Sequence, residues 1–96
     1  MNTLQRLERW FMANCDGDWE HGSGITISTL DNPGWTIDIN VEETTLAGRV
    51  SEISKVDRTE TDWLHSSCDG TVFKLRCGPG NLEEALQLFL DMAERT

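Results

Sequence analysis

The chain opens with a pattern of apolar and polar positions that is typical of an amphipathic helix. Over residues 3–14 the apolar side chains share one helical stripe, made of Leu4, Leu7, Trp10 and Phe11. Thr3 is the expected N-cap, because its hydroxyl can accept a hydrogen bond from a free N–H of the first turn. Asp16 and Gly17 favour turn geometry, so we expect the helix to stop at Cys15–Gly17.

A second helical pattern closes the chain after Gly78-Pro79-Gly80. Its wide apolar stripe consists of Leu82, Ala85, Leu86, Phe89, Leu90 and Ala93. Asn81 is the expected cap of this helix. Glu83 and Glu84 would occupy its first turn, where negative charge favours the positive end of the helix dipole.

Between the helices, the period of alternation changes to the two-residue repeat of strands. Ile25–Leu30 and Trp35–Val41 both alternate in this way, and Asp31–Gly34 between them reads Asp-Asn-Pro-Gly. Pro33 presets the backbone angle of a turn, and Gly34 accepts the positive φ that a type II turn requires. These two strands are predicted to form a hairpin with one apolar face.

The middle of the chain has a less regular pattern. Leu46–Ile53 is a candidate third strand, in which Gly48 would mark a bulge. Ser54–Ser67 is polar and charged, which indicates a loop, with Trp63–Leu64 anchoring it to the core. Thr71–Cys77 alternates again and is predicted to be a strand.

This order of elements predicts an α+β domain that spans residues 1–96 as a single unit. We expect two layers, with a roughly four-stranded antiparallel sheet and the N- and C-terminal helices packed on one face of it. The other face of the sheet would be partly open to solvent.

The net charge of the chain limits the classes of molecule that it is expected to bind. The chain has 17 acidic and 8 basic residues, a formal net charge of -9. Nucleic acid and anionic membrane surfaces are disfavoured as partners, because binding them requires a basic surface. A basic protein partner is favoured, although the same acidity is also explained by the solubility of a small domain.

The three cysteines, Cys15, Cys68 and Cys77, lack C-x-x-C spacing and are odd in number. This pattern predicts reduced thiols rather than a disulfide framework or a zinc site. The chain shows neither a secretory leader nor a long apolar run, so the expected localisation is cytoplasmic, and no cofactor is expected.

Candidate chemistry concentrates in residues 15–35, which contain two Trp, four Gly and four carboxylates. A metal-binding or hydrolytic interpretation is suggested by the cluster of Asp16, Asp18, Glu20 and His21. An EF-hand loop counted from Asp16 needs Gly at its sixth position and Glu at its twelfth, but His21 and Ile27 stand there. We assign no metal or catalytic residue, and keep a small metal-binding or hydrolytic protein as the alternative function.

A purely structural interpretation also remains open for each of these residues. The four tryptophans can all be core or core-rim residues, because a buried indole contributes a large apolar area. Asp16, Asp18 and Asp31 can bond their own backbone in turns, and His21 can be structural. The functional hypothesis rests on the group, which lies in an irregular segment where binding residues tend to occur.

The motifs Cys-Asp-Gly-Asp-Trp-Glu-His at residues 15–21 and Thr-Leu-Asp-Asn-Pro-Gly-Trp at residues 29–35 closely resemble the immunity protein 53 family of bacterial polymorphic-toxin systems. Leu4, Leu7 and Trp10 of the first helix are similar to that family as well. The resemblance is most specific from Leu4 to Leu46 and looser in the second half of the chain.

The resemblance implies a small antidote that neutralises a cognate bacterial toxin by direct stoichiometric binding and is not an enzyme. The toxin would be a basic domain of nuclease type, because an acidic partner can occlude a basic surface. The hypothesised toxin-binding residues are Asp16, Asp18, Trp19, Glu20, His21 and Asp31. The sequence leaves the oligomeric state open, and an interaction domain of another complex is a further alternative.

Overall fold

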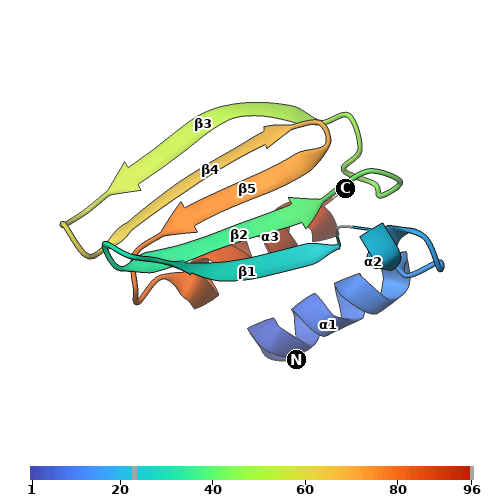
Figure 1. The fold of residues 1–96 in the computed structure, drawn as a ribbon, viewed down its shortest axis with the longest axis horizontal. Helices are drawn as coiled ribbons and strands as arrows, with labels where there is room; N and C mark the ends of the chain where they lie inside the picture. Colours follow the sequence, from blue (N-terminus) through green and yellow to red (C-terminus); the bar gives the residue numbers. More distant parts are fainter. Residues whose placement is uncertain (23, 96) are drawn as a thin grey trace.

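The computed structural model describes residues 1–22 and 24–95 and confirms the α+β class, with a helix at each end of the chain (Figure 1). The elements are, in order, α1 (Thr3–Asn14), α2 (Trp19–Gly22), β1 (Ile25–Leu30), β2 (Gly34–Asn40), β3 (Val50–Asp57), β4 (Trp63–Asp69), β5 (Val72–Cys77) and α3 (Leu82–Glu94). The sheet therefore has five strands, one more than the sequence pattern predicted.

The strands form one antiparallel sheet in the order β1-β2-β5-β4-β3. The predicted hairpin forms between β1 and β2, where Ile25 pairs with Ile39 and Thr29 with Trp35. The last strand, β5, inserts between β2 and β4, so β1 and β3 are the edges of the sheet (Figure 1).

One face of the sheet and the two long helices enclose the core. Ile37, Ile39, Phe73, Leu75, Phe89 and Leu90 are all at most 2% exposed. Trp10 of α1 contacts Phe89 of α3, whose ring contacts Phe73 of β5, with ring centroids 4.9 and 5.3 Å apart. Both helices therefore contribute to the same core. The three cysteines are free thiols, and only Cys15 is exposed.

The opposite face of the sheet carries no helix and presents polar side chains. Cross-strand pairing places Thr36 beside Arg76 and Asp38 beside Lys74, and His65 and Ser67 continue the row on β4. Trp63 also lies on this face, because it is two residues from His65 along the same strand. The expectation that Trp63 anchors to the core is therefore wrong, whereas its neighbour Leu64 is buried.

The prediction that Ser54–Ser67 forms a loop is wrong. These residues instead form the end of β3, a short turn and most of β4. β3 is an edge strand whose residues are almost all exposed, so it lacks the alternation that marks a half-buried strand. The bulge lies between Ser51 and Ser54 and not at Gly48, which precedes the strand with a φ of 77°.

The ends of the helices also differ from the prediction. Asn2, not Thr3, is the N-cap of α1, and its side chain and that of Gln5 form a reciprocal capping box. Thr3 is buried, and its hydroxyl accepts a hydrogen bond from Gln87 of α3 at 3.1 Å. Asn81 does occupy the N-cap position of α3, but its side chain makes no capping hydrogen bond.

Candidate functional site

The loop between α1 and α2 is organised by two carboxylates that bond its backbone. Oδ1 of Asp16 accepts hydrogen bonds from the N–H groups of Asp18 and Trp19 at 2.9 and 3.0 Å. The carboxylate of Glu20 accepts from the N–H groups of Asp16 and Gly17 at 2.9 and 2.8 Å. Asp16 and Glu20 therefore shape this loop, and their oxygens are already engaged within it.

These hydrogen bonds stabilise the ionised carboxylates. The backbone N–H groups of Trp19 and Asp18 lower the pKa of the Asp16 carboxyl below its ordinary range. The pKa of the Glu20 carboxyl is lowered by its own backbone N–H and by those of Asp16 and Gly17. Both side chains remain charged at neutral pH, so they add to the negative potential of the loop.

Trp19 is a buried anchor for the same loop, with 5% of its surface exposed. Its ring lies 5.6 Å from that of Trp10 and 5.5 Å from that of Phe11. Its Nε1–H donates to the backbone carbonyl of Asn40 at 3.0 Å, which ties α2 to the end of β2. Because so little of its surface is exposed, Trp19 holds the loop in place from the core and has almost no surface that a partner could contact.

Asp18 and His21 are exposed, and Asp18 lies beside the loop that follows β2. Asp18, Glu42 and Glu43 line a shallow depression of about 180 Å³, with Trp19, Gly22 and Asn40 completing its walls. We call the three carboxylates Asp18, Glu42 and Glu43 the acidic depression. Glu42 and Glu43 were missed in the sequence, where the only signal was a pair of acids directly after a predicted strand.

The loop that carries Glu42 and Glu43 is held by local hydrogen bonds. Oδ1 of Asn40 accepts from the N–H of Glu42 at 2.8 Å, and the hydroxyl of Thr44 donates to the carbonyl of Val41 at 2.6 Å. Leu46 buries the far end of the loop in the core. Glu43 adopts a φ of 62°, a left-handed conformation that is uncommon for a residue other than glycine.

Asp31 is not brought together with this cluster. It is exposed in the turn between β1 and β2, at the end of the hairpin that is far from α2 (Figure 1). The six hypothesised residues therefore divide into the positioning residues Asp16, Trp19 and Glu20, the exposed pair Asp18 and His21, and the distant Asp31. Their role in toxin binding stays a prediction.

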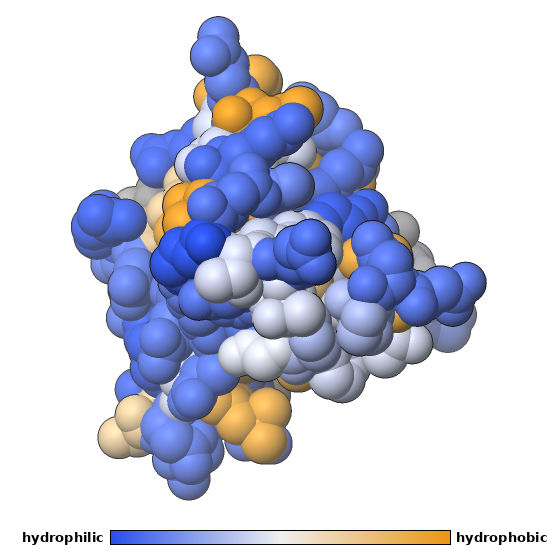
Figure 2. Space-filling model, turned by 90° about the vertical axis from the view of Figure 1, so that its left-hand side faces the viewer, coloured by the Kyte–Doolittle hydropathy of each residue, from blue (hydrophilic) through white to orange (hydrophobic). Residues whose placement is uncertain are grey.

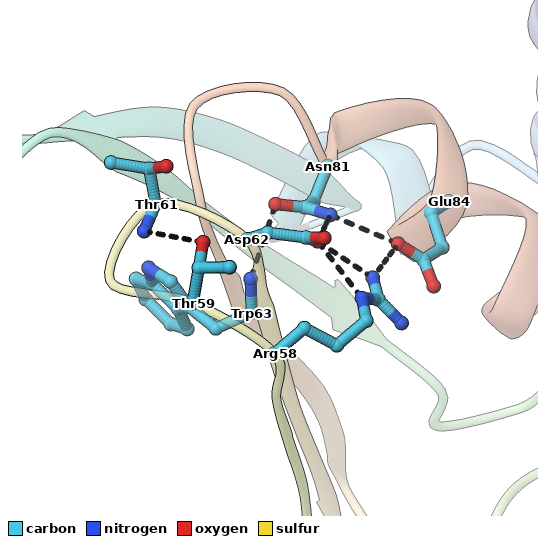
Figure 3. A network of polar contacts seen from close by, with 7 residues as sticks. All are labelled: Arg58, Thr59, Thr61, Asp62, Trp63, Asn81 and Glu84. Carbon is cyan, nitrogen blue, oxygen red and sulfur yellow. Dashed lines mark hydrogen bonds and ion pairs between the residues drawn. The ribbon is translucent and has the colours of Figure 1, made fainter.

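A second polar cluster joins the β3–β4 turn to the start of α3 (Figure 3). Arg58 donates to Asp62 at 3.0 Å and to Glu84 at 2.6 Å. Asn81, which is 7% exposed, donates to the same two carboxylates and accepts from the N–H of Trp63. Asn81 thus connects the turn to the helix instead of capping it, which explains the missing cap bond.

Acid should destabilise this protein through these engaged carboxylates. Arg58 and then Asn81 lower the pKa of both Asp62 and Glu84, as the backbone lowers those of Asp16 and Glu20. Groups with a lowered folded-state pKa contribute stability above their unfolded values, 3.8 for Asp and 4.5 for Glu, and lose it as the pH falls through the lowered values. We expect the midpoint of urea unfolding to be flat near neutral pH and to fall below about pH 4.5. A midpoint unchanged down to about pH 3 would contradict this expectation.

The geometry offers no support for a metal centre in the described part of the chain. Among residues 1–22 and 24–95, no three His, Cys, Asp or Glu side chains are grouped so that they could hold a metal ion. The carboxylates of Asp16 and Glu20, which the hydrolytic interpretation needs, point at backbone N–H groups of their own loop.

Residues 1–22 and 24–95 include no helix with the length and the apolar character that a membrane span requires.

Comparison with known proteins identifies the family. The chain matches the family described as immunity protein 53 over residues 4–94, which is nearly its whole length. Neither the curated proteins nor the solved structures contain a match. The match reaches from the first turn of α1 to the end of α3 and includes α2 and strands β1 to β5, and so also the second half of the chain, where the resemblance in sequence motifs is looser. The chain therefore belongs to the immunity protein 53 family, and this membership indicates an antitoxin role.

Proposed function

We propose that this protein neutralises a cognate bacterial toxin by binding it directly and stoichiometrically, without catalysis. The observation that carries the proposal is the family match over residues 4–94. The antidote would act in the cytoplasm of the cell that makes the toxin, with no cofactor. Residues 1–22 and 24–95 contain no group of three His, Cys, Asp or Glu side chains that would favour the metal-binding alternative.

The proposed contact surface is the acidic depression together with His21. Asp18, Glu42 and Glu43 come from two separate loops, and Trp19 and Asn40 hold those loops together. Asp16 and Glu20 would act indirectly, by fixing the backbone that presents Asp18. Asp31 would belong to the contact surface only if the toxin also reached the other end of the hairpin.

Electrostatics supports a basic toxin, such as a domain of nuclease type. The net charge of -9 attracts a basic surface over a long range, and an acidic depression fixes where that surface docks. The same charge repels nucleic acid and anionic membranes, which we do not propose as partners. Complementary fields of this kind raise association rates roughly 10- to 1000-fold at low salt.

Neutralising the acidic depression tests this surface. In the triple variant D18N/E42Q/E43Q, we expect the association rate with the toxin encoded next to this gene to fall about tenfold or more at low salt, because steering is lost. The difference should shrink in high salt, where exposed charges are screened. Surface plasmon resonance at two salt concentrations would measure both effects.

The matched control is the triple variant E8Q/E52Q/E83Q. It removes the same charge from exposed glutamates on α1, β3 and α3, and these make no ion pair within residues 1–22 and 24–95. We expect its association rate to fall much less. Equal losses in the two triple variants would show that net charge alone matters and that the acidic depression is not the contact surface.

A further inference from the structure

The open face of the sheet contains two adjoining hollows, which share His65 and Arg76 in their linings. The larger hollow, of about 450 Å³, lies between the β1–β2 and β3–β4 turns and includes Trp63. The smaller hollow, of about 230 Å³, extends across β3, β4 and β5 and includes Ile53. Figure 2 looks onto the end of the molecule where these turns lie, and shows a mainly hydrophilic surface with small, separate hydrophobic patches.

The lining of the smaller hollow is basic, whereas the whole chain is acidic, although Asp38 pairs with Arg76 beside the hollow. Lys55, Lys74 and Arg76 line it, together with His65, Ile53, Ser66 and Ser67. Three of the chain's eight Lys and Arg residues therefore gather here, and none of its seventeen acids is among the described lining residues. We call this hollow the cationic hollow. A local concentration of positive charge on an acidic protein attracts a negatively charged group at this place.

Two of these cations are available to a ligand. The ammonium groups of Lys55 and Lys74 make no hydrogen bond or ion pair with other residues of 1–22 and 24–95. The pKa of Asp69 is lowered by the backbone N–H groups of Val72 and Thr71 and, to a smaller extent, by the positive charge of Lys74. The guanidinium of Arg76 is held in place by Asp38 and by the carbonyl of Leu75, at 2.9 and 2.8 Å. Asp38 balances most of the charge of Arg76, so Lys55 and Lys74 supply the excess positive charge of this hollow.

The neighbouring hollow supplies an apolar surface beside the charge. The Trp63 ring lies 4.9 Å from that of His65, and Nε2 of His65 lies 2.8 Å from Oδ1 of Asp57. These contacts hold Trp63 on the open face, where half-buried aromatic rings commonly bind apolar side chains of a partner. The carboxylates in this hollow, Asp57 and Glu60, oppose the entry of a second negative charge.

We propose that the open face binds a protein segment in which a carboxylate side chain occupies the cationic hollow and an adjacent apolar side chain packs on Trp63. A protein segment fits better than nucleic acid, because the charge is confined to one small hollow and the chain as a whole repels a polyanion. This surface shares no lining residue with the acidic depression, so the proposal does not depend on toxin binding at that depression.

A short peptide provides a direct probe. We would titrate the ¹⁵N-labelled protein with acetyl-Leu-Asp-Leu-amide and follow the amide and indole resonances by NMR. The expected result is a saturable shift of the Trp63 indole and of the amides of Ser67, Lys74 and Arg76. The neutral control, acetyl-Leu-Asn-Leu-amide, should shift these resonances much less, because it lacks the charge that the lysines recognise.

Two matched double variants test whether Lys55 and Lys74 bind the carboxylate of the peptide. K55Q/K74Q should weaken binding of the acidic peptide at least threefold, and R9Q/R49Q, which removes equal charge elsewhere, should leave it unchanged. The spectra themselves report whether each variant is folded. Equal shifts with the Asp and Asn peptides, equal weakening by the two double variants, or binding of a six-nucleotide oligothymidine in place of the peptide would each overturn the proposal.

Discussion

Replacing Trp19 by alanine should destabilise the protein by about 3–5 kcal/mol, the usual cost of truncating a buried aromatic side chain. The ring is 5% exposed and contacts both Trp10 and Phe11. Its loss would leave a cavity between α1 and α2 and leave the carbonyl of Asn40 without its donor. Urea unfolding followed by circular dichroism would measure the change in the free energy of unfolding.

Trp19→Phe separates the ring from its N–H. It keeps most of the apolar contact but removes the hydrogen bond to Asn40, so we expect a smaller loss of about 1–3 kcal/mol. A Trp19→Ala variant with unchanged stability and weakened toxin binding would contradict the structural role. It would restore the hypothesis, drawn from the sequence, that Trp19 is a contact residue.

The second large effect is expected at Gly34. A Cβ on this residue would lie 2.3 Å from the backbone carbonyl oxygen of Cys77 on the neighbouring strand. Since neither strand can yield without loss of sheet hydrogen bonds, Gly34→Ala should cost at least the 1–3 kcal/mol that is typical of overpacking, by rough estimate. Thermal unfolding would show this as a lowered Tm.

Gly80→Ala is the matched control, because a Cβ at Gly80 meets no atom within 4 Å. Its effect should stay within about 0.5 kcal/mol of zero, as for most surface substitutions. If Gly34→Ala and Gly80→Ala had equal stability, the close approach of β2 to the end of β5 would be wrong.

Gly34 also illustrates what a turn motif predicts and what it does not. The residues Asp-Asn-Pro-Gly correctly mark a turn between two strands. The predicted positive φ at Gly34 is wrong, because the glycines with positive φ are Gly17, Gly24, Gly48 and Gly70. The glycine is required by a strand that is distant in sequence, and local turn chemistry contains no information about such a neighbour.

The other elements were likewise predictable where the local sequence pattern determines them, and not where a distant strand does. Strand β2 and both long helices were predictable, because each buries one face and leaves the other in water. Leu4 of α1 and Ile27 of β1 are exceptions, since the structure leaves both exposed. β3 was not predictable in this way, since an edge strand with exposed Val50, Ile53 and Val56 has no consistent apolar face. Its place in the sheet is set by pairing with β4.

The candidate site was predictable only in part. The structural interpretation of Asp16, as a residue that bonds its own backbone in a turn, is confirmed. The short helix α2 and the hydrogen bonds to Glu20 were not predicted, because they depend on the folded geometry of the loop. Glu42 and Glu43 join Asp18 through the tertiary contact of Trp19 with Asn40. A single sequence does not show which distant loops such a contact brings together.

We propose that this member of the immunity protein 53 family neutralises its toxin by forming a stable complex with it. The most direct test is co-expression with the toxin encoded next to its gene, followed by purification and native mass spectrometry of the product. Growth should be rescued, and the two proteins should form a one-to-one complex. A folded protein that neither rescues growth nor binds the toxin would contradict it.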